Sequence, residues 1–358
     1  MKELKKKLTT RVKDPVVKPR DLVSCGSSQL NLACSGYVTG GFPKGRYILL
    51  GGVSDAAKTW LGLSVLAEAS INPEFDDYDL IYDTPEEGAS MDKAYFFGDR
   101  LKQRIRPLIG TRKRPDCSRT VEQFYDAIDE RLEEGKPFIC LLDSETALTI
   151  EADLRKQAKQ KKARQGGKEE KGSYQTEKAK EHARRLRVIR PKLKDTGSIL
   201  IFISQLRDRI GFGAQFEPKY RPGGTALSFF AEIEIWMYVK KTIKTVYRGK
   251  KRQQGMIVLA KVKRTRLTGK KQSATISIYH DSGIDDVGDC VNFLVDEKCW
   301  KAKKGIIRAE EFGKKMHREE LIQYIERENL EPRVRTLVKR IWKEIEEAVA
   351  LKRKFRYV

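Results

Sequence analysis

One stretch, residues 44–63, constrains the fold more than any other part of the chain. An apolar run suited to a buried strand, Tyr47 to Leu50, meets two glycines and a short polar loop. Lys58 and Thr59 then open a segment with the apolar spacing of a helix. A loop between a strand end and a helix start can turn backbone N–H groups toward a phosphate, and the helix N-terminus adds partial positive charge. The stretch therefore predicts a nucleoside triphosphate site.

The motif also predicts what its members do. Lys58 is expected to reach the terminal phosphates, and Thr59 the magnesium ion. Ala57 departs from the motif, which has glycine directly before the lysine, and an alanine held at positive φ costs about 1 kcal/mol. The residues expected to contact the nucleotide are Gly52, Ser54, Asp55, Ala56, Ala57, Lys58, Thr59 and Trp60.

Acidic residues follow two further strand-like runs. The run at Tyr78 to Asp83 leads to Glu86 and Glu87, and the run at 138–142 ends at Asp143. Side chains just past the carboxyl ends of parallel strands lie in the crevice where such sheets bind ligands. A glutamate there could polarise the water that attacks the γ-phosphate, and Asp143 could hold magnesium.

The remaining apolar patterns alternate between helix and strand periods, which is typical of an α/β fold. Helices are expected at Thr59 to Ala69, Met91 to Ile105, Val121 to Glu133, Ala179 to Lys194, Asp289 to Glu297, Arg318 to Glu328 and Val334 to Arg353, with a short one capped by Ser27. Strands are expected at Ser198 to Ile203, Glu232 to Val239, Gly255 to Val262 and Ser273 to Tyr279. The second and third of these strands read as an antiparallel pair joined by a basic hairpin at 248–252.

The charge balance points to a polyanionic partner. Lys and Arg number 73 against 50 Asp and Glu, and the net charge of +23 makes nucleic acid the first candidate. Residues 151–194 alone hold 16 Lys and Arg against 6 Asp and Glu. In residues 207–222, glycines, aromatics and arginines interleave, which suits a segment that wraps a single strand and stacks rings on its bases.

Cysteine and histidine usage argues against two other site types. The six cysteines include no Cys-x-x-Cys pair and the three histidines lie far apart, so neither a zinc site nor a disulfide framework is expected, and a reducing compartment fits better. The first residues have charges but no apolar core, and no 18-residue apolar run occurs later, so we expect a chain that is neither secreted nor membrane-spanning.

Taken in order, four motifs resemble the RecA recombinase family, and more specifically the divergent RecA-like recombinases of bacteriophages. The motifs are Gly40 to Arg46, Leu142-Asp143-Ser144 with Ala147-Leu148, Ile203 to Arg207, and Gly223-Gly224-Thr225-Ala226-Leu227-Ser228-Phe229-Phe230-Ala231. The similarity covers roughly residues 21–300. It implies a basic N-terminal arm at 1–20, a RecA-like ATPase core at 21–285 with a mostly parallel twisted sheet flanked by helices, and a small, mostly helical C-terminal module at 286–358.

The resemblance implies an ATP- and Mg²⁺-dependent filament on single-stranded DNA that pairs it with double-stranded DNA and exchanges strands. Gln205 would sense the γ-phosphate, Tyr95 would stack on adenine, and Arg264 and Arg266 would reach the ATP of the adjacent subunit. Lys58, Gln205 and Glu86 would act in catalysis, with Glu87 the alternative base. The DNA loops would lie near 150–178 and 207–222, with either Phe212 or Phe216 wedged between bases. The residues assigned to DNA are Arg155, Lys161, Lys162, Arg164, Lys168, Arg207, Arg209, Phe212, Phe216, Arg221, Gly223 and Gly224.

Departures from the family pattern keep other functions open. Ala57 replaces a glycine, Pro85 stands where the family has its catalytic glutamate, the N-terminal arm is short, and the C-terminal tail is basic. A recombination mediator that binds DNA and has a degenerate nucleotide site is one alternative, and a hexameric helicase-type motor is another. The expected partners are further copies of the chain and a recombination mediator or single-strand-binding protein, at DNA in the cytoplasm of a bacterial host.

Overall fold

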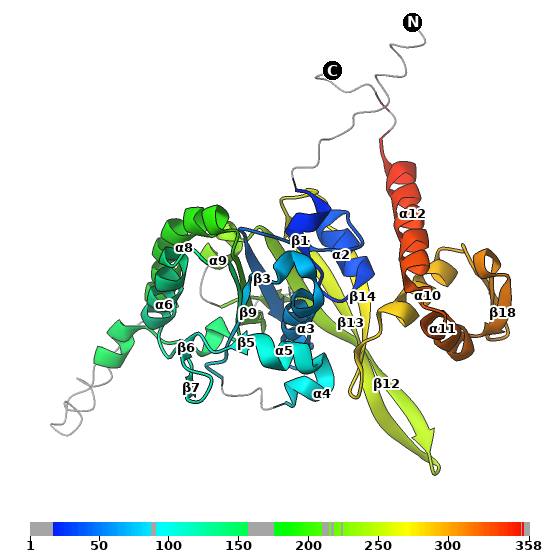
Figure 1. Cartoon of the computed structure of the whole chain (residues 1–358), viewed down its shortest axis with the longest axis horizontal. Coiled ribbons are helices and arrows are strands. Elements are labelled where there is room, and N and C mark those ends of the chain that lie inside the picture. The colour runs from blue at the N-terminus through cyan, green and yellow to red at the C-terminus, as the bar shows by residue number, and fades with distance from the viewer. Residues whose placement is uncertain are drawn as a thin grey trace, which may run out of the picture.

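The computed structural model describes residues 17–86, 91–156, 175–209, 215, 218–222, 225–351 and 353. A large twisted sheet runs through the middle of this part of the chain (Figure 1). Its strands, in spatial order, are β15 (Gly283–Ile284), β14 (Ser273–Tyr279), β13 (Lys250–Thr265), β12 (Ile233–Tyr247), β3 (Tyr47–Gly52), β9 (Ile199–Gln205), β8 (Phe138–Leu142), β4 (Asp79–Asp83) and β5 (Ile105–Arg106). From β12 to β5 all neighbours pair in parallel, and from β12 to β15 they pair antiparallel.

Both faces of the sheet are covered, because its strands alternate apolar side chains toward each. In β3, Ile48 and Leu50 pack into one buried cluster with α3 (Lys58–Ile71), whereas Tyr47 and Leu49 pack into another with α6 (Val121–Glu133) and α8 (Gln175–Thr196). Strands buried on both faces read as continuous apolar runs, which explains why the sequence showed them clearly. The predicted α/β fold with a mostly parallel sheet is confirmed.

Shorter elements surround this core. Three two-stranded pairs are present in the described residues: β1 (Leu22–Val23) with β2 (Phe42–Pro43), β6 (Ile109–Gly110) with β7 (Pro115–Asp116), and β10 (Arg207–Asp208) with β11 (Lys219–Tyr220). The helix predicted after Ser27 is α2 (Ser28–Ser35), and the Ser27 side chain caps it by accepting a hydrogen bond from the Leu30 amide. The short α9 (Ala226–Phe230) leads into β12.

The single helix predicted at Met91 to Ile105 is wrong. The chain instead forms α4 (Lys93–Phe97) and α5 (Asp99–Arg104), and Ile105 already belongs to β5. Gly98, between the two helices, has φ of +85°, which is outside the helical region and accessible to glycine at little cost. Apolar residues continue at helical spacing on both sides of Gly98, so the apolar pattern did not reveal that the helix ends there.

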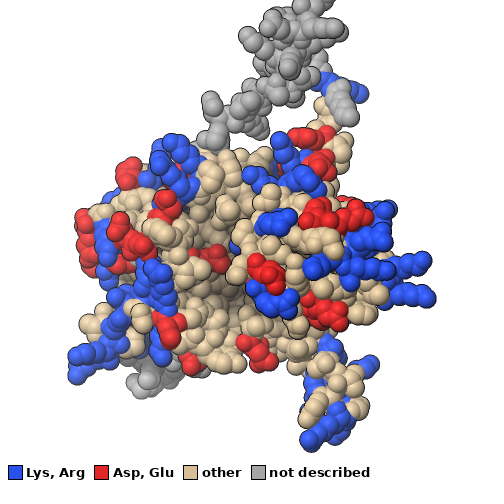
Figure 2. Space-filling view, turned by 45° about the vertical axis from the view of Figure 1, so that its right-hand side comes forward, with Lys and Arg blue, Asp and Glu red and all other residues tan. Residues whose placement is uncertain are grey.

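The antiparallel pair β12–β13 is confirmed and is longer than predicted, with its strands reaching Tyr247 and Lys250. Arg248 and Gly249 both have positive φ, 50° and 70°, as the tight hairpin turns that match strand twist require. The outer part of the pair projects from the body of the molecule as a two-stranded ribbon (Figure 1). Blue Lys and Arg side chains gather toward the tip of this projection in Figure 2.

The C-terminal module contains a small three-stranded sheet in addition to its helices. The helices α10 (Asp286–Asp296), α11 (Arg318–Arg327) and α12 (Glu331–Val349) are accompanied by β16 (Lys301–Lys303), β17 (Ile306–Ala309) and β18 (Lys314–His317). A separate apolar cluster holds the module together, with Trp300 fully buried in it. The three strands are only three or four residues long, and lysines make up much of β16 and β18, so their sequence shows no extended apolar alternation.

Candidate nucleotide-binding site

The phosphate-loop motif forms the turn between the end of β3 and the start of α3. Ala57, the residue directly before the helix, has φ of +59°, so the positive φ expected at this position is present despite the missing glycine. Asp55 also has positive φ, 57°, which the sequence did not reveal. Two non-glycine residues in the left-handed region within three positions mean that the surrounding fold determines the loop conformation.

A cavity of about 340 Å³ lies beside this loop. Ten of the predicted site residues line it: Ser54, Asp55, Ala56, Ala57, Lys58, Thr59, Trp60, Glu86, Asp143 and Gln205. Four further lining residues were not predicted, namely Ser144, Ile203, Met256 and His280. Met256 and His280 come from β13 and from the end of β14, whose sequences carry no nucleotide motif, so only the fold could identify them.

Lys58 projects along the loop that precedes it. Its Nζ donates a hydrogen bond to the Val53 carbonyl at 2.7 Å. Burial lowers the pKa of the ammonium, while the Asp143 carboxylate acts in the opposite direction. Gly52 is also required here, because an added Cβ would lie 2.9 Å from Lys58 Cδ and 3.1 Å from the Met237 carbonyl oxygen. The lysine therefore lies against backbone at the base of the loop, with its charge inside the cavity.

Thr59 and Asp143 meet on the wall of the cavity. The Thr59 hydroxyl donates to Asp143 Oδ2 at 2.6 Å, and the Tyr82 hydroxyl donates to the same oxygen at 3.2 Å. Burial raises the pKa of the Asp143 carboxyl, and the hydrogen bond from Thr59 opposes that shift. A hydroxyl and a carboxylate side by side supply the oxygen ligands that Mg²⁺ prefers, so these residues fit the metal that the motif implies.

Glu86 connects two parts of the cavity. Its Oε1 accepts hydrogen bonds from the Ser144 hydroxyl and from Gln205 Nε2, the latter at 3.2 Å. Gln205 is the last residue of β9, one strand away from β3 on one side and β8 on the other. The Gln205 amide also donates to Thr146 Oγ1 at 3.2 Å. Glu87, the alternative base, lies outside the described residues.

Four residues predicted to contact the nucleotide do not line this cavity: Gly52, which lies against Lys58, and Tyr95, Arg264 and Arg266. Tyr95 is 66% exposed and packs edge-on against Phe96, which in turn contacts Trp60. Arg264 and Arg266 donate to the carbonyls of Ser228 and Phe229. Strand pairing places Glu234, the partner of Arg264, beside Leu49, whereas Met237 lies beside Gly52. The two arginines therefore lie near the amino end of β3, whereas the phosphate loop of their own chain follows the carboxyl end of that strand.

The residues predicted to bind DNA separate into three groups. Arg155 and Arg207 are exposed, Arg155 in an ion pair with Glu151 at 3.0 Å, and Arg209 has its guanidinium 5.9 Å from the Tyr220 ring. Arg221 differs from these, because it is buried and its charge helps to lower the pKa of the Glu145 carboxyl. The others lie outside the described residues: Lys161, Lys162, Arg164, Lys168, Phe212, Phe216, Gly223 and Gly224.

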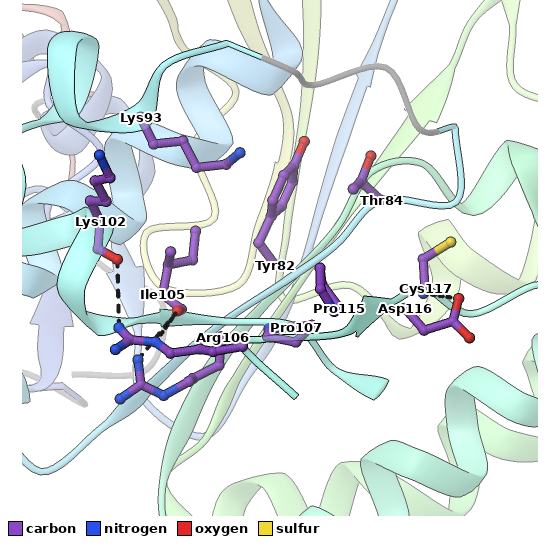
Figure 3. Close-up of a pocket in the computed structure, with 11 residues that line it drawn as sticks. Tyr82, Thr84, Lys93, Lys102, Ile105, Arg106, Pro107, Pro115, Asp116 and Cys117 are labelled. Atoms are coloured by element: carbon purple, nitrogen blue, oxygen red, sulfur yellow. Dashed lines mark hydrogen bonds between the residues drawn. The ribbon is translucent and has the colours of Figure 1, made fainter. Parts of the chain in front are cut away.

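A second, larger cavity of about 680 Å³ lies on the other side of β4 (Figure 3). Its lining is basic, with Lys93, Lys102, Arg106 and Arg112, and Asp116 at the side of Cys117. The Arg112 guanidinium is held by the carbonyls of Lys102 and Ile105. Tyr82 lines this cavity and donates a hydrogen bond to Asp143, which lines the first cavity. The sequence analysis did not predict this cavity, because the residues that line it come from separate elements: β4, α4, α5, β5 and the β6–β7 hairpin.

The fold and this geometry define a P-loop protein: the phosphate-loop motif joins β3 to α3, and Asp143, which follows β8 two strands away in the sheet, accepts a hydrogen bond from Thr59 in the first turn of α3. Residues 2–285 match the model of the RecA N-terminal domain, and the chain belongs to the RecA family. The predicted family resemblance is thereby confirmed, and with it a RecA-type role in DNA recombination and repair. None of the described helices combines the length and apolar character needed to span a membrane.

Several curated proteins are similar to the chain. Protein RecA of Thermus thermophilus is 26% identical over 278 residues, which cover 77% of this chain and 72% of that protein. Protein RecA of Helicobacter hepaticus is 27% identical over 286 residues, covering 79% and 73%. The mitochondrial DNA repair protein recA homolog of Dictyostelium discoideum is 27% identical over 293 residues, covering 77% of this chain and 54% of that longer protein.

The strain at Ala57 predicts opposite effects for two neighbouring substitutions. Ala57→Gly removes a left-handed alanine and should raise the free energy of unfolding by up to about 1 kcal/mol. Ala56→Gly is the matched control, because Ala56 is buried without positive φ, and it should lower that free energy by roughly 0.5–1 kcal/mol. Urea unfolding followed by circular dichroism measures both, and a change of the same sign in the two variants would contradict the strain.

Proposed function

We propose that the chain is an ATP-dependent DNA recombinase that forms filaments on single-stranded DNA and catalyses homologous pairing and strand exchange. The observation that supports this most directly is the hydrogen bond between Gln205 and Glu86. It joins a carboxylate in the nucleotide cavity to the strand end from which Arg207 and the 207–222 segment depart. A change at the nucleotide would thereby reach a segment whose composition suits single-stranded DNA.

Each residue of the cavity has a role in ATP hydrolysis under this proposal. Thr59 and Asp143 hold Mg²⁺, which when bound neutralises charge that develops on the phosphates. Lys58 exchanges its bond to the Val53 carbonyl for the terminal phosphates. Glu86 takes the proton of the attacking water, and Gln205 responds to whether the γ-phosphate is present, because both side chains share one hydrogen bond.

Assembly completes the site. Since Arg264 and Arg266 lie away from the phosphate loop of their own chain, we propose that they act on the nucleotide of an adjacent copy. Tyr95, exposed beside the Phe96–Trp60 contact, is the proposed adenine-stacking residue. The same proposal places the chain among the bacteriophage recombinases and has it act on DNA in the cytoplasm of the host. Its second substrate is double-stranded DNA, and its partner is a recombination mediator or a single-strand-binding protein. The motifs and the net charge of +23 support these points.

The proposal predicts ATP hydrolysis that single-stranded DNA stimulates. Lys58→Ala should lower the DNA-stimulated rate by roughly 10²-fold or more, because it removes a charge aimed at the transferring phosphate. Lys102→Ala, which removes a lysine from the other cavity, should leave the rate within about twofold. Binding to DNA should weaken steeply with added salt. A DNA affinity that ignores ATP, together with hydrolysis that ignores DNA, would instead indicate a mediator with a degenerate site.

A site shared between copies predicts rescue by mixing. The Lys58→Ala variant and the Arg264→Ala/Arg266→Ala double variant should each be inactive alone, because each lacks one half of every site. Mixed in equal amounts on single-stranded DNA, they should regain part of the activity at junctions where the intact halves meet. Electron microscopy of the wild-type chain with ATP and DNA should show helical filaments; rings would favour a helicase-type motor, and absence of rescue would refute the shared site.

If Glu86 is the catalytic base, a variant at this position should lose ATP hydrolysis but keep ATP binding. Glu86→Gln keeps the shape of the side chain and should lower the hydrolysis rate by about 10²-fold or more while ATP still binds. Glu87→Gln is the matched control and should retain turnover within about tenfold. Single-turnover hydrolysis and equilibrium binding of a fluorescent ATP analogue measure the two effects, and a larger loss in the Glu87 variant would move the role to that residue.

A further inference from the structure

A buried polar cluster lies directly behind the nucleotide cavity, centred on Glu145. This glutamate begins the short η3 helix (Glu145–Ala147), two residues after Asp143, and is 5% exposed. Its Oε1 accepts a hydrogen bond from the Ser204 hydroxyl at 2.7 Å. Its Oε2 lies 3.4 Å from Lys178 Nζ and 3.6 Å from His182 Nε2. One carboxylate thus contacts side chains from β9 and α8.

Backbone contacts tighten the same junction. Lys178 Nζ also donates to the Glu145 carbonyl at 2.6 Å, so α8 holds η3 through both side chain and main chain. The next residue, Thr146, accepts the hydrogen bond from the Gln205 amide at 3.2 Å. On the far side of the imidazole, His182 Nδ1 pairs with the Tyr125 hydroxyl at 3.0 Å. The cluster therefore fixes where Gln205 stands relative to α8.

A carboxylate in this position needs a physical reason. Removing a charge from water costs several kcal/mol, and well-packed apolar residues usually fill a buried site at equal or lower free energy. The positions that follow, Leu148 and Ile150, are apolar and buried in the adjoining core. Burial lowers the pKa of His182 to about 4, so the imidazole is neutral at pH 7 and the compensating charges are those of Lys178 and Arg221. Apolar packing does not select particular partners, whereas the Glu145 carboxylate holds particular donors, the Ser204 hydroxyl of β9 and the Lys178 ammonium of α8.

Those segments are the ones that lead to DNA in the proposed function. Lys178 lies at the start of α8 and is the last residue of the basic segment, 150–178, predicted as the first DNA loop. Ser204 precedes Gln205 and the second DNA loop, and Arg221, whose charge acts on Glu145, ends that loop. No residue in the cluster lines the nucleotide cavity.

We propose that Glu145 is a positioning residue that couples both DNA loops to the nucleotide cavity by holding α8 and the end of β9 in one fixed arrangement. The inference rests on the proposed function, because it explains how DNA contact at either loop reaches Gln205. DNA that pulls on α8 shifts η3 through Lys178, and with η3 the threonine to which the Gln205 backbone is bound. This movement changes the hydrogen bond that the Gln205 side chain donates to Glu86.

Replacing the charge while keeping the shape tests the coupling. Glu145→Gln should leave DNA-free ATP hydrolysis within about twofold and lower the stimulation by single-stranded DNA, as a ratio to the basal rate, by about tenfold. Glu347→Gln is the matched control, since Glu347 forms an exposed ion pair with Lys343 of the same helix, α12, and contacts neither α8, η3 nor β9, and its ratio should stay unchanged. The ratio is measured well below the melting temperature of each variant, so a loss of stability alone does not change it.

A second variant keeps the test decisive if Glu145→Gln does not fold. Ser204→Ala removes only the hydroxyl that Glu145 accepts and should lower the same ratio, by about threefold or more. Where both variants fold, the double variant should be no worse than Glu145→Gln alone, because the two groups act as one unit. A wild-type chain without DNA stimulation would refute the proposed function itself. A stimulated wild type whose ratio survives in the folded variants would overturn this inference alone.

Discussion

The parallel register of four neighbouring strands is the constraint on which the site depends. Pairing sets Gly52 beside Gln205 and Leu142 beside Phe202, so β3, β8 and β9 end at one edge of the sheet. Everything that acts on a nucleotide sits within a few residues of those ends, on segments far apart in sequence. Because a slip of one residue would turn each side chain to the opposite face, the continuous apolar cores on both sides of the sheet protect the chemistry as well as the fold.

Polar contacts at this edge form two layers with different exposure. In the layer that faces the cavity, Glu86 is exposed and exchanges hydrogen bonds with Gln205 and Ser144. Behind it, Glu145 is enclosed, and its partners come from α8 and β9. Solvated groups rearrange at little cost, whereas enclosed ones move only together. The outer layer is suited to respond to a ligand, and the inner layer to transmit that response to distant segments.

Much of this could be predicted from the sequence, and the successes share a cause. Strands buried on both faces, such as β8 and β9, are apolar without interruption, and the phosphate loop is a local motif whose chemistry requires fixed spacing. Asp143 directly follows one such strand, and Gln205 is the last residue of another. The family motifs then gave roles to residues that periodicity alone could not have assigned.

The failures arise where information is not local. Gly98 ends one helix and starts another without changing the number of apolar residues, and β16 to β18 are too short to show an apolar alternation. Met256 and His280 enter the cavity only because β13 and β14 pair beside β12. Arg221 reads as an exposed basic residue until tertiary packing encloses it near Glu145. Glu145 itself, one acidic residue after a strand, carries no signal of its three partners.

The left-handed conformation of Ala57 also bears on the affinity of the loop for a nucleotide. A nucleotide binds only the fraction of molecules whose loop already has the competent shape, and the apparent dissociation constant rises as that fraction falls. About 1 kcal/mol of strain corresponds to roughly a fivefold shift in such an equilibrium. The chain would then need a higher ATP concentration for half-saturation than a glycine-containing loop of the same contacts.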